Sequence, residues 1–135
     1  MKATTEHKQL MVMLPITSRT MEDLFVTALE GGSNHWCQIS DKSCDAVREA
    51  VPTGSFSEAT WKAISEFDVK VRIYDVESGE TLGVLTHELI TERMAAMHND
   101  KTVLNRMVNI LHEEYDADDA DVVFQYLLMG EIVFG

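Results

Sequence analysis

The chain has 135 residues, 45% of them apolar, with 23 acidic side chains against 11 basic ones and a formal net charge of −12. This length and composition predict one globular domain, neither disordered throughout nor built from repeats. The charge repels the phosphates of nucleic acids and the headgroups of anionic lipids, which argues against direct nucleic-acid or membrane binding. No apolar run approaches the ~18 residues of a membrane span.

The N-terminal residues 1–8 are polar, and we expect them to be frayed ahead of a single domain over 9–135. Apolar residues then alternate at Leu10, Val12, Leu14 and Ile16, which predicts a strand. Pro15 cannot donate a ladder hydrogen bond, so the strand should lie at a sheet edge or end there.

A helix is predicted over 19–30, because its apolar residues recur at steps of three and four. Gly31 and Gly32 should end it, as a glycine in the left-handed conformation commonly does. A short strand at 35–40 and a short helix at 43–51 follow. Residues 56–66 fit neither period, and Trp61 within them looks exposed.

The strongest strand signal comes next: Val69, Val71 and Ile73 alternate with polar residues, and the turn 77–80 predicts a hairpin with 81–85. Three helices are predicted in the part of the chain that follows the hairpin. Their expected caps are Thr86, then Asp100 or Thr102, then Asp118 or Asp119. A last strand is expected at 131–134, and Gly130 should end the third helix. The predicted fold is α+β: an antiparallel sheet of about four strands, with helices mainly on one face.

The most distinctive stretch runs from Gly31 to Cys37, Gly-Gly-Ser-Asn-His-Trp-Cys. Three interpretations are open: a structural turn after the helix, a phosphate cradle, or a site for a neutral or aromatic ligand. The cradle is disfavoured because phosphate loops precede a helix, whereas this one follows a helix C-terminus. The predicted ligand-binding residues are Gly31, Gly32, Asn34, His35 and Trp36, with positive charge from Arg72 or Lys70.

Other candidate chemistry is weaker. His35 and Cys37 would share one face of a strand and allow a thiolate–imidazole pair, but no third orienting group is evident. The run Asp116–Asp121 fails the calcium-loop pattern, since Asp121 stands where glycine is needed and Leu127 where glutamate is needed. No metal set or cofactor fingerprint is recognised. The two cysteines, Cys37 and Cys44, are typical of free thiols in a reducing cytoplasm.

Three segments resemble motifs of small uncharacterised bacteriophage and prophage proteins. They are Val26–Trp36, the hairpin Asp75–Gly83, and the C-terminal run Asp116–Gln125 that closes in Gly130–Gly135. Together they cover about a third of the chain. His35 stands where the resemblance leads us to expect an aromatic residue. The resemblance implies a cytoplasmic accessory protein acting on host defence or metabolism by binding, which is an analogy at the level of a class.

Two functions are therefore in view. The first is a non-enzymatic binder of a small ligand, such as a nucleotide-derived signal, at the Gly31–Trp36 turn. The second is an acidic inhibitor of a host protein that imitates nucleic acid, motivated by the net charge and the acidic run 113–121. Catalysis rests only on His35 and Cys37. Homo-oligomerisation is compatible with each, because Ile132–Phe134 can extend a partner's sheet or its own.

Overall fold

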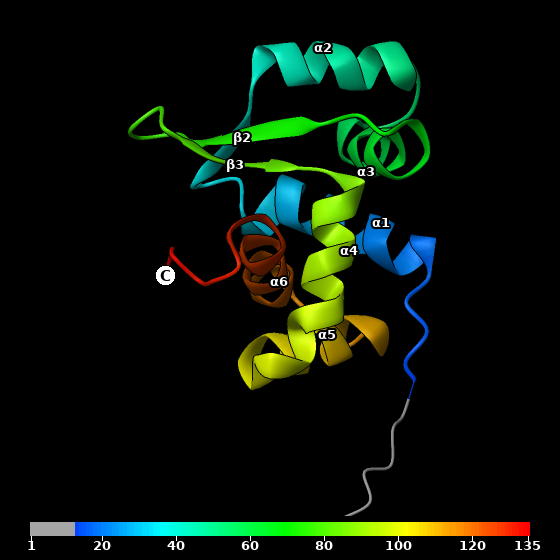
Figure 1. The fold of residues 1–135 in the computed structure, drawn as a ribbon, viewed down its shortest axis with the longest axis vertical. Coiled ribbons are helices and arrows are strands. Elements are labelled where there is room, and N and C mark those ends of the chain that lie inside the picture. The colour runs from blue at the N-terminus through cyan, green and yellow to red at the C-terminus, as the bar shows by residue number, and fades with distance from the viewer. Residues whose placement is uncertain (1–12) are drawn as a thin grey trace, which may run out of the picture.

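The computed structural model describes residues 13–135, a group of helices around a small antiparallel sheet (Figure 1). This confirms the α+β class. The helices of the described part are α1 (Ser18–Thr27), α2 (Asp41–Ala50), α3 (Phe56–Phe67), α4 (His87–Ala96), α5 (Lys101–Leu111) and α6 (Ala117–Met129), with short π and 3-10 turns η1 (Ala28–Gly32) and η2 (Met97–Asn99). The strands are β1 (Cys37–Ile39), β2 (Val71–Asp75) and β3 (Thr81–Leu85). Across residues 13–135, every helix is too short or too polar to cross a bilayer.

Among the described residues the sheet has three strands in the order β1-β2-β3, not the four expected. Both pairs are antiparallel, with Ile39 opposite Ile73 and Val71 opposite Leu85. The hairpin is confirmed. Residues 13–17 form no strand, while Leu10 and Val12 lie outside the described residues, as does the segment 1–8.

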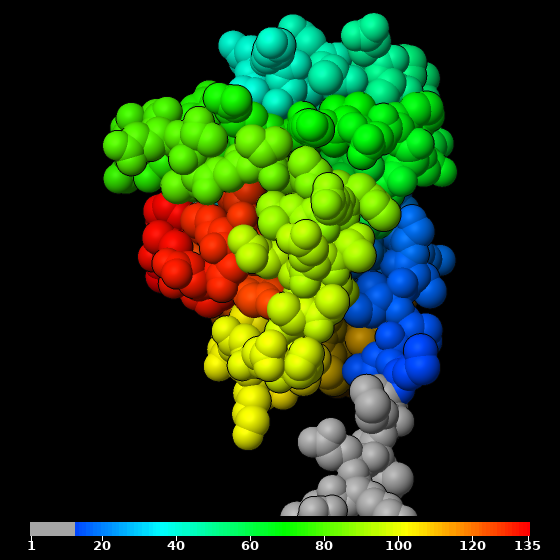
Figure 2. Space-filling model, in the orientation of Figure 1, coloured from blue at the N-terminus to red at the C-terminus, as the bar shows by residue number. Residues whose placement is uncertain are grey.

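The expected C-terminal strand is also wrong, since residues 131–134 adopt no regular structure. The physical reason is that a side chain, not a neighbouring strand, bonds this backbone. Gln125 Oε1 accepts hydrogen bonds from the N–H groups of Val133 and Phe134 at 2.9 and 2.8 Å. Figure 2 shows the red C-terminal residues packed directly beneath the green hairpin.

Helix α6 is the centre of the core, and ten consecutive residues from Asp119 to Leu128 are buried. It packs against β3 so closely that a Cβ on Gly83 would lie 2.9 Å from Leu128 Cδ1. Phe124 on α6 meets Phe25 of α1 edge-on at 5.6 Å between ring centroids. In Figure 1, α2 lies on the other side of β2 from α4, α5 and α6.

Residues 56–66, which the sequence left open, form α3. Ser55 caps this helix by accepting from the Glu58 N–H at 3.3 Å. Its buried stripe includes Ala59, Ala63 and Ile64. Trp61 was expected to be exposed but is buried. Only 8% of its surface is accessible, because its ring packs against that of Phe25 with the centroids 5.2 Å apart.

The double glycine does not end α1 in the left-handed conformation. Helix α1 continues into the π turn η1, which contains Gly31 and Gly32, and the glycines with positive φ among residues 13–135 are Gly54, Gly79 and Gly130. Gly32 is required for a different reason: a Cβ there would overlap the backbone carbonyl oxygen of Ala117, at the start of α6.

The expected caps at Thr86 and Asp100 are confirmed, and so is the left-handed Gly130 that ends α6. Asp116, not Asp118 or Asp119, caps α6. Its carboxylate accepts from the Asp119 N–H at 3.0 Å, and Asp119 accepts in return from the Asp116 N–H at 3.2 Å. This reciprocal pairing satisfies two donors that a helix start leaves free.

Candidate functional site

Two of the motif segments, Val26–Trp36 and Asp116–Gln125, meet in the core at the carboxylate of Asp121. Asp121 is only 6% exposed. Asp121 Oδ1 accepts hydrogen bonds from Ser33 Oγ and Trp36 Nε1, both at 2.7 Å. Asp121 Oδ2 accepts from Gln125 Nε2 at 3.0 Å. Three donors therefore replace the water that the buried carboxylate has lost. The distinctive sequence at 31–37 thus holds η1 and β1 against α6.

The C-terminal residues cover the indole of Trp36. The Phe134 ring stacks on it with centroids 4.8 Å apart and planes inclined by 12°. Gln125 holds Phe134 in place, since its Nε2 also donates to the Phe134 carbonyl at 3.0 Å. Trp36 is consequently 3% exposed.

The residues predicted to bind a ligand are not gathered around one cavity. Gly32 and Trp36 are buried, whereas Gly31, Asn34 and His35 are exposed. The Asn34 side chain donates to the Glu30 carbonyl at 3.4 Å. The hollow that touches His35 and Trp36 has a volume of about 160 Å³, below the roughly 300–1,000 Å³ usual for small-molecule sites.

Arg72 lies away from this turn. The Val76 N–H donates to the Trp36 carbonyl at 3.0 Å, which places Trp36 beside Val76. Val76 lies four positions after Arg72 along β2 and the residue that follows it, or about 13 Å at the usual rise per strand residue. Arg72 is exposed and lines a different hollow with Lys70.

His35 and Cys37 are not arranged as a catalytic pair. Strand β1 begins at Cys37, so His35 precedes it. Burial, and then the negative charge of Asp121, raise the pKa of the Cys37 thiol to about 12. The thiol is therefore protonated at neutral pH and is a poor nucleophile. Cys37 and Cys44 are both free thiols.

The aspartates of the run 116–121 serve the fold. Arg106 Nη1 donates to Asp119 Oδ1 at 2.8 Å and lies 3.0 Å from Asp118 Oδ2. Burial acts to raise the pKa of Asp119, but hydrogen bonds from Arg106, the Asp116 backbone and Asn109 outweigh it, and the pKa lies below its ordinary value. Asp119 is therefore an ionised anchor that ties α5 to α6.

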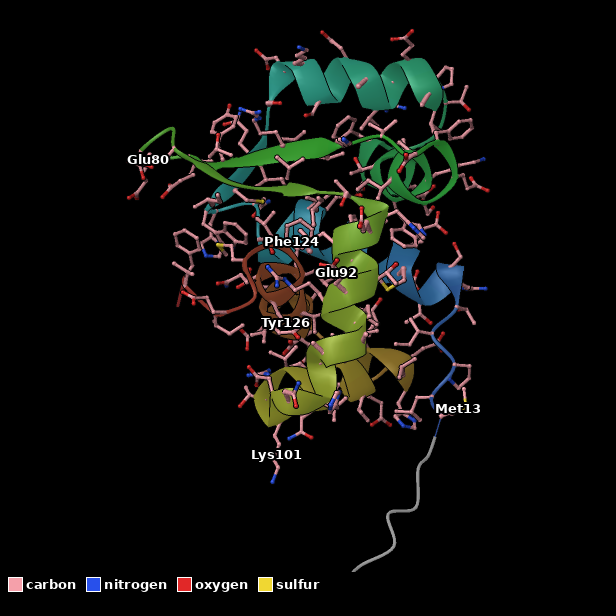
Figure 3. All side chains as sticks on the ribbon, viewed as in Figure 1. Met13, Glu80, Glu92, Lys101, Phe124 and Tyr126 are labelled. Carbon is pink, nitrogen blue, oxygen red and sulfur yellow. The ribbon has the colours of Figure 1, made fainter. Side chains whose placement is uncertain are left out.

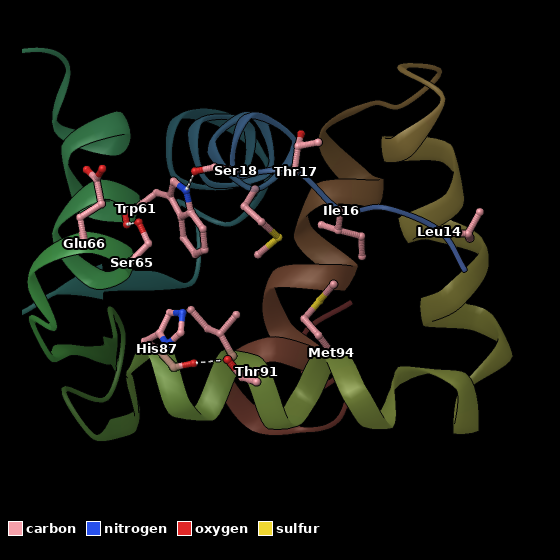
Figure 4. Close-up of a pocket in the computed structure, with 12 residues that line it drawn as sticks. Leu14, Ile16, Thr17, Ser18, Trp61, Ser65, Glu66, His87, Thr91 and Met94 are labelled. Carbon is pink, nitrogen blue, oxygen red and sulfur yellow. Dashed lines mark hydrogen bonds between the residues drawn. The ribbon is translucent and has the colours of Figure 1, made fainter. Parts of the chain in front are cut away.

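A larger hollow with mostly apolar walls, here called the apolar hollow, opens between α1, α3, α4 and the segment before α1 (Figure 4). Its volume is about 520 Å³. The apolar residues that line it are Leu14, Ile16, Met21, Trp61, Ile90 and Met94. In Figure 4 the polar residues Ser65, Glu66 and His87 lie on the Trp61 side of the hollow, its polar end, and Ile16, Leu14 and Met94 lie on the other side, its apolar end.

Trp61 forms a fixed wall of the apolar hollow. Its Nε1–H donates to Ser18 Oγ at 3.0 Å, which links α3 to the first turn of α1. Sequence reasoning missed this site because it assigned no period to 56–66 and treated Trp61 as exposed. The available signal was Ser55, followed three residues later by Glu58, a pattern that marks a helix start.

No protein-family model, curated protein or solved structure matches this chain.

Proposed function

We propose that the protein is a non-enzymatic binder of a small, elongated, amphipathic molecule, held in the apolar hollow. The observation that carries the proposal is a cavity of about 520 Å³ with apolar walls and polar groups at one end. Small-molecule sites typically combine a volume of this size with a few polar groups that orient the ligand.

The polar end favours a neutral or cationic headgroup. Among residues 13–135, Glu66 is the carboxylate that lines the hollow, and neither lysine nor arginine does so. The pair between Glu66 and Lys62 is weak, because its atoms are 4.0 Å apart and both side chains are more than half exposed. A ligand amine can therefore approach the Glu66 carboxylate, whereas a ligand carboxylate is repelled.

The apolar end explains an otherwise costly exposure. Leu14 and Ile16 are 47% and 36% exposed beside the wall formed by Met94. Covering such surface with an alkyl chain gains about 25 cal/mol per Å² of apolar area removed from water.

We propose binding and not catalysis because two lining hydroxyls are engaged by the backbone. Ser65 Oγ donates to the Trp61 carbonyl at 2.8 Å, and Thr91 Oγ1 donates to the His87 carbonyl at 2.9 Å. Among residues 13–135, no general base accepts a hydrogen bond from either hydroxyl to activate it.

The motif segments Val26–Trp36, Asp116–Gln125 and Gly130–Gly135, which resemble phage and prophage proteins, do not line the apolar hollow. The proposal therefore does not rest on them.

We do not advance the acidic inhibitor, because exposed carboxylates lie on separate elements: α2, α3, α4, the hairpin turn and the segment 113–118. Imitation of nucleic acid needs carboxylates concentrated on one face. The dispersed charge is sufficient for solubility.

The test is isothermal titration calorimetry with hexylamine, octylamine, octanol and octanoate. We expect octylamine to bind more tightly than octanol and octanoate to bind most weakly. Each added methylene should improve affinity by up to about fourfold, from about 0.8 kcal/mol per buried CH₂. Absence of heat from all four compounds would refute the proposal.

Two variants provide the matched comparison. Thr91→Phe fills the hollow from an exposed position, and Thr102→Phe adds the same ring at an exposed position on α5. Octylamine binding should be lost in the first variant and retained in the second. Equal affinity in both would place binding elsewhere and contradict the assignment.

A further inference from the structure

A second hollow lies between α2 and the β2–β3 strands, and three cationic side chains line it. Lys42 belongs to the first turn of α2, Lys70 immediately precedes β2, and Arg72 lies within β2. The volume is about 720 Å³, and the described residues that line it include neither aspartate nor glutamate. We call it the basic hollow.

The alternation of the strand aims two of these cations outward. Val71 and Ile73 are fully buried in the core, so Lys70 and Arg72 project from the opposite face and are exposed. The third cation comes from α2, which lies on that side of β2 in Figure 1. The convergence of the three follows from the strand period and the position of α2.

Hydrogen bonds hold the start of α2 against Arg72. The Ser43 hydroxyl oxygen accepts from the Arg72 N–H at 2.9 Å, and the Ser40 N–H donates to the Arg72 carbonyl at 3.0 Å. Both backbone polar groups of Arg72 are thus bonded to the first turn of the helix that carries Lys42. The backbone positions from which Arg72 and Lys42 project are therefore fixed by the fold before any ligand arrives, which lowers the ordering cost of binding.

These cations have no ion-pair partner among residues 13–135. In the part of the chain that the structure describes, ion pairs involve Lys62 and Arg106, and none includes Lys42, Lys70 or Arg72. Asp41, next to Lys42 in sequence, lines a separate hollow with Cys37 and Cys44. In a chain of net charge −12, three unpaired cations around one concavity form a local site of opposite sign.

We propose that the basic hollow binds a small phosphate-bearing anion. The guanidinium of Arg72 presents a planar fork that matches two phosphate oxygens, and Lys42 and Lys70 add compensating charge. The net charge of −12 repels long polyanions, which favours a ligand with one or two phosphates over a nucleic acid. This site is independent of the apolar hollow, and either can fail without the other.

The test is calorimetry at low ionic strength with pyrophosphate, adenosine monophosphate and adenosine. We expect binding of at least one of the two anions and none of adenosine. Tighter binding of the nucleotide would identify a nucleotide as the source of the phosphate, whereas tighter binding of pyrophosphate would identify an inorganic one. Absence of binding by both anions, or adenosine binding as tightly as the nucleotide, would overturn the proposal.

Charge-matched variants make the test specific to the hollow. Arg72→Gln removes an exposed charge and keeps the backbone hydrogen bonds to α2. It should weaken the affinity for the anion by about 10- to 100-fold. Lys101→Gln removes one charge at the end of the molecule away from α2 (Figure 3) and should leave affinity within about twofold. Lys42→Gln and Lys70→Gln repeat the test should Arg72→Gln fail to fold. Equal weakening by Lys101→Gln and the hollow variants would show a general charge effect and refute the site.

Discussion

Replacing Asp121 with alanine perturbs the junction that holds the Ser33–Trp36 turn against α6. The substitution removes the acceptor shared by the Ser33 hydroxyl and the Trp36 indole N–H, which are 0% and 3% exposed. Each buried donor left without a partner costs about 1–3 kcal/mol, while removing a desolvated carboxylate returns part of that cost. We expect a net loss of about 2–4 kcal/mol, a large share of the roughly 5–15 kcal/mol typical of a domain.

Urea unfolding followed by far-UV circular dichroism measures this loss as a shift of the midpoint at constant slope. The control is Asp118→Ala, whose side chain is 65% exposed and whose pair with Arg106 should contribute only about 0–1 kcal/mol. A double-mutant cycle with Trp36→Phe isolates the indole bond, with an expected coupling of about 1–2 kcal/mol. If Asp121→Ala lost no more stability than Asp118→Ala, the structural role assigned to Asp121 would be wrong.

Three further predictions concern the thiols, a close backbone contact and acid stability. Burial raises the pKa of the Cys37 thiol to about 12 and also raises the pKa of the half-buried Cys44 thiol. A disulfide reagent at pH 8 should therefore label Cys44 slowly and Cys37 only after unfolding. Rapid labelling of Cys37 in the native protein would contradict its burial. Gly32→Ala should lower the urea midpoint more than an alanine substitution at an exposed position does, because the added Cβ would overlap the backbone at the start of α6. The pKa of Asp119 is lowered in the folded state, so its stabilising contribution is complete above the unfolded value and is lost as pH falls below about 4. Asp119→Asn should therefore flatten the acid limb of a pH series of urea midpoints, and an unchanged limb would contradict the pairing with Arg106.

Local sequence signals predicted the elements whose stabilisation is itself local. The hairpin follows from alternation around Ile73 and a glycine turn, and Thr86, Asp100 and Gly130 act at helix ends as their side-chain chemistry predicts. The residues at the helix ends bond neighbours two to four positions away, and Ile73 pairs with Gly83 only ten positions away, so their pattern is visible in the sequence.

Two of the errors arose where residues outside the local pattern decide the structure. Residues 131–134 alternate like a strand, but Gln125 bonds their backbone in place of a neighbouring strand. Gly31 and Gly32 suggest a helix end, but the close approach of α6 to Gly32 is what requires glycine. Neither partner is identifiable from local propensity.

The candidate sites divide in the same way. The sequence drew attention to Trp36, whose indole is a buried donor to a carboxylate 85 residues away. It treated Trp61, which lines the apolar hollow, as an exposed residue without a role. The sequence assigned Arg72 to the Gly31–Trp36 turn, but Arg72 lines a different hollow, and its companions Lys42 and Ser43 come from α2, which only the folded chain brings beside it.

The most direct test of the proposed function uses the two indole N–H groups as internal reporters in a ¹⁵N-resolved NMR titration with octylamine. Trp61 lines the apolar hollow, whereas the Trp36 indole is held by Asp121 and covered by Phe134. We predict that the Trp61 indole signal and the backbone signals of α1, α3 and α4 around the hollow shift in a saturable manner, while the Trp36 indole signal stays in place. Shifts of both indoles together, or of neither, would contradict ligand binding in the apolar hollow.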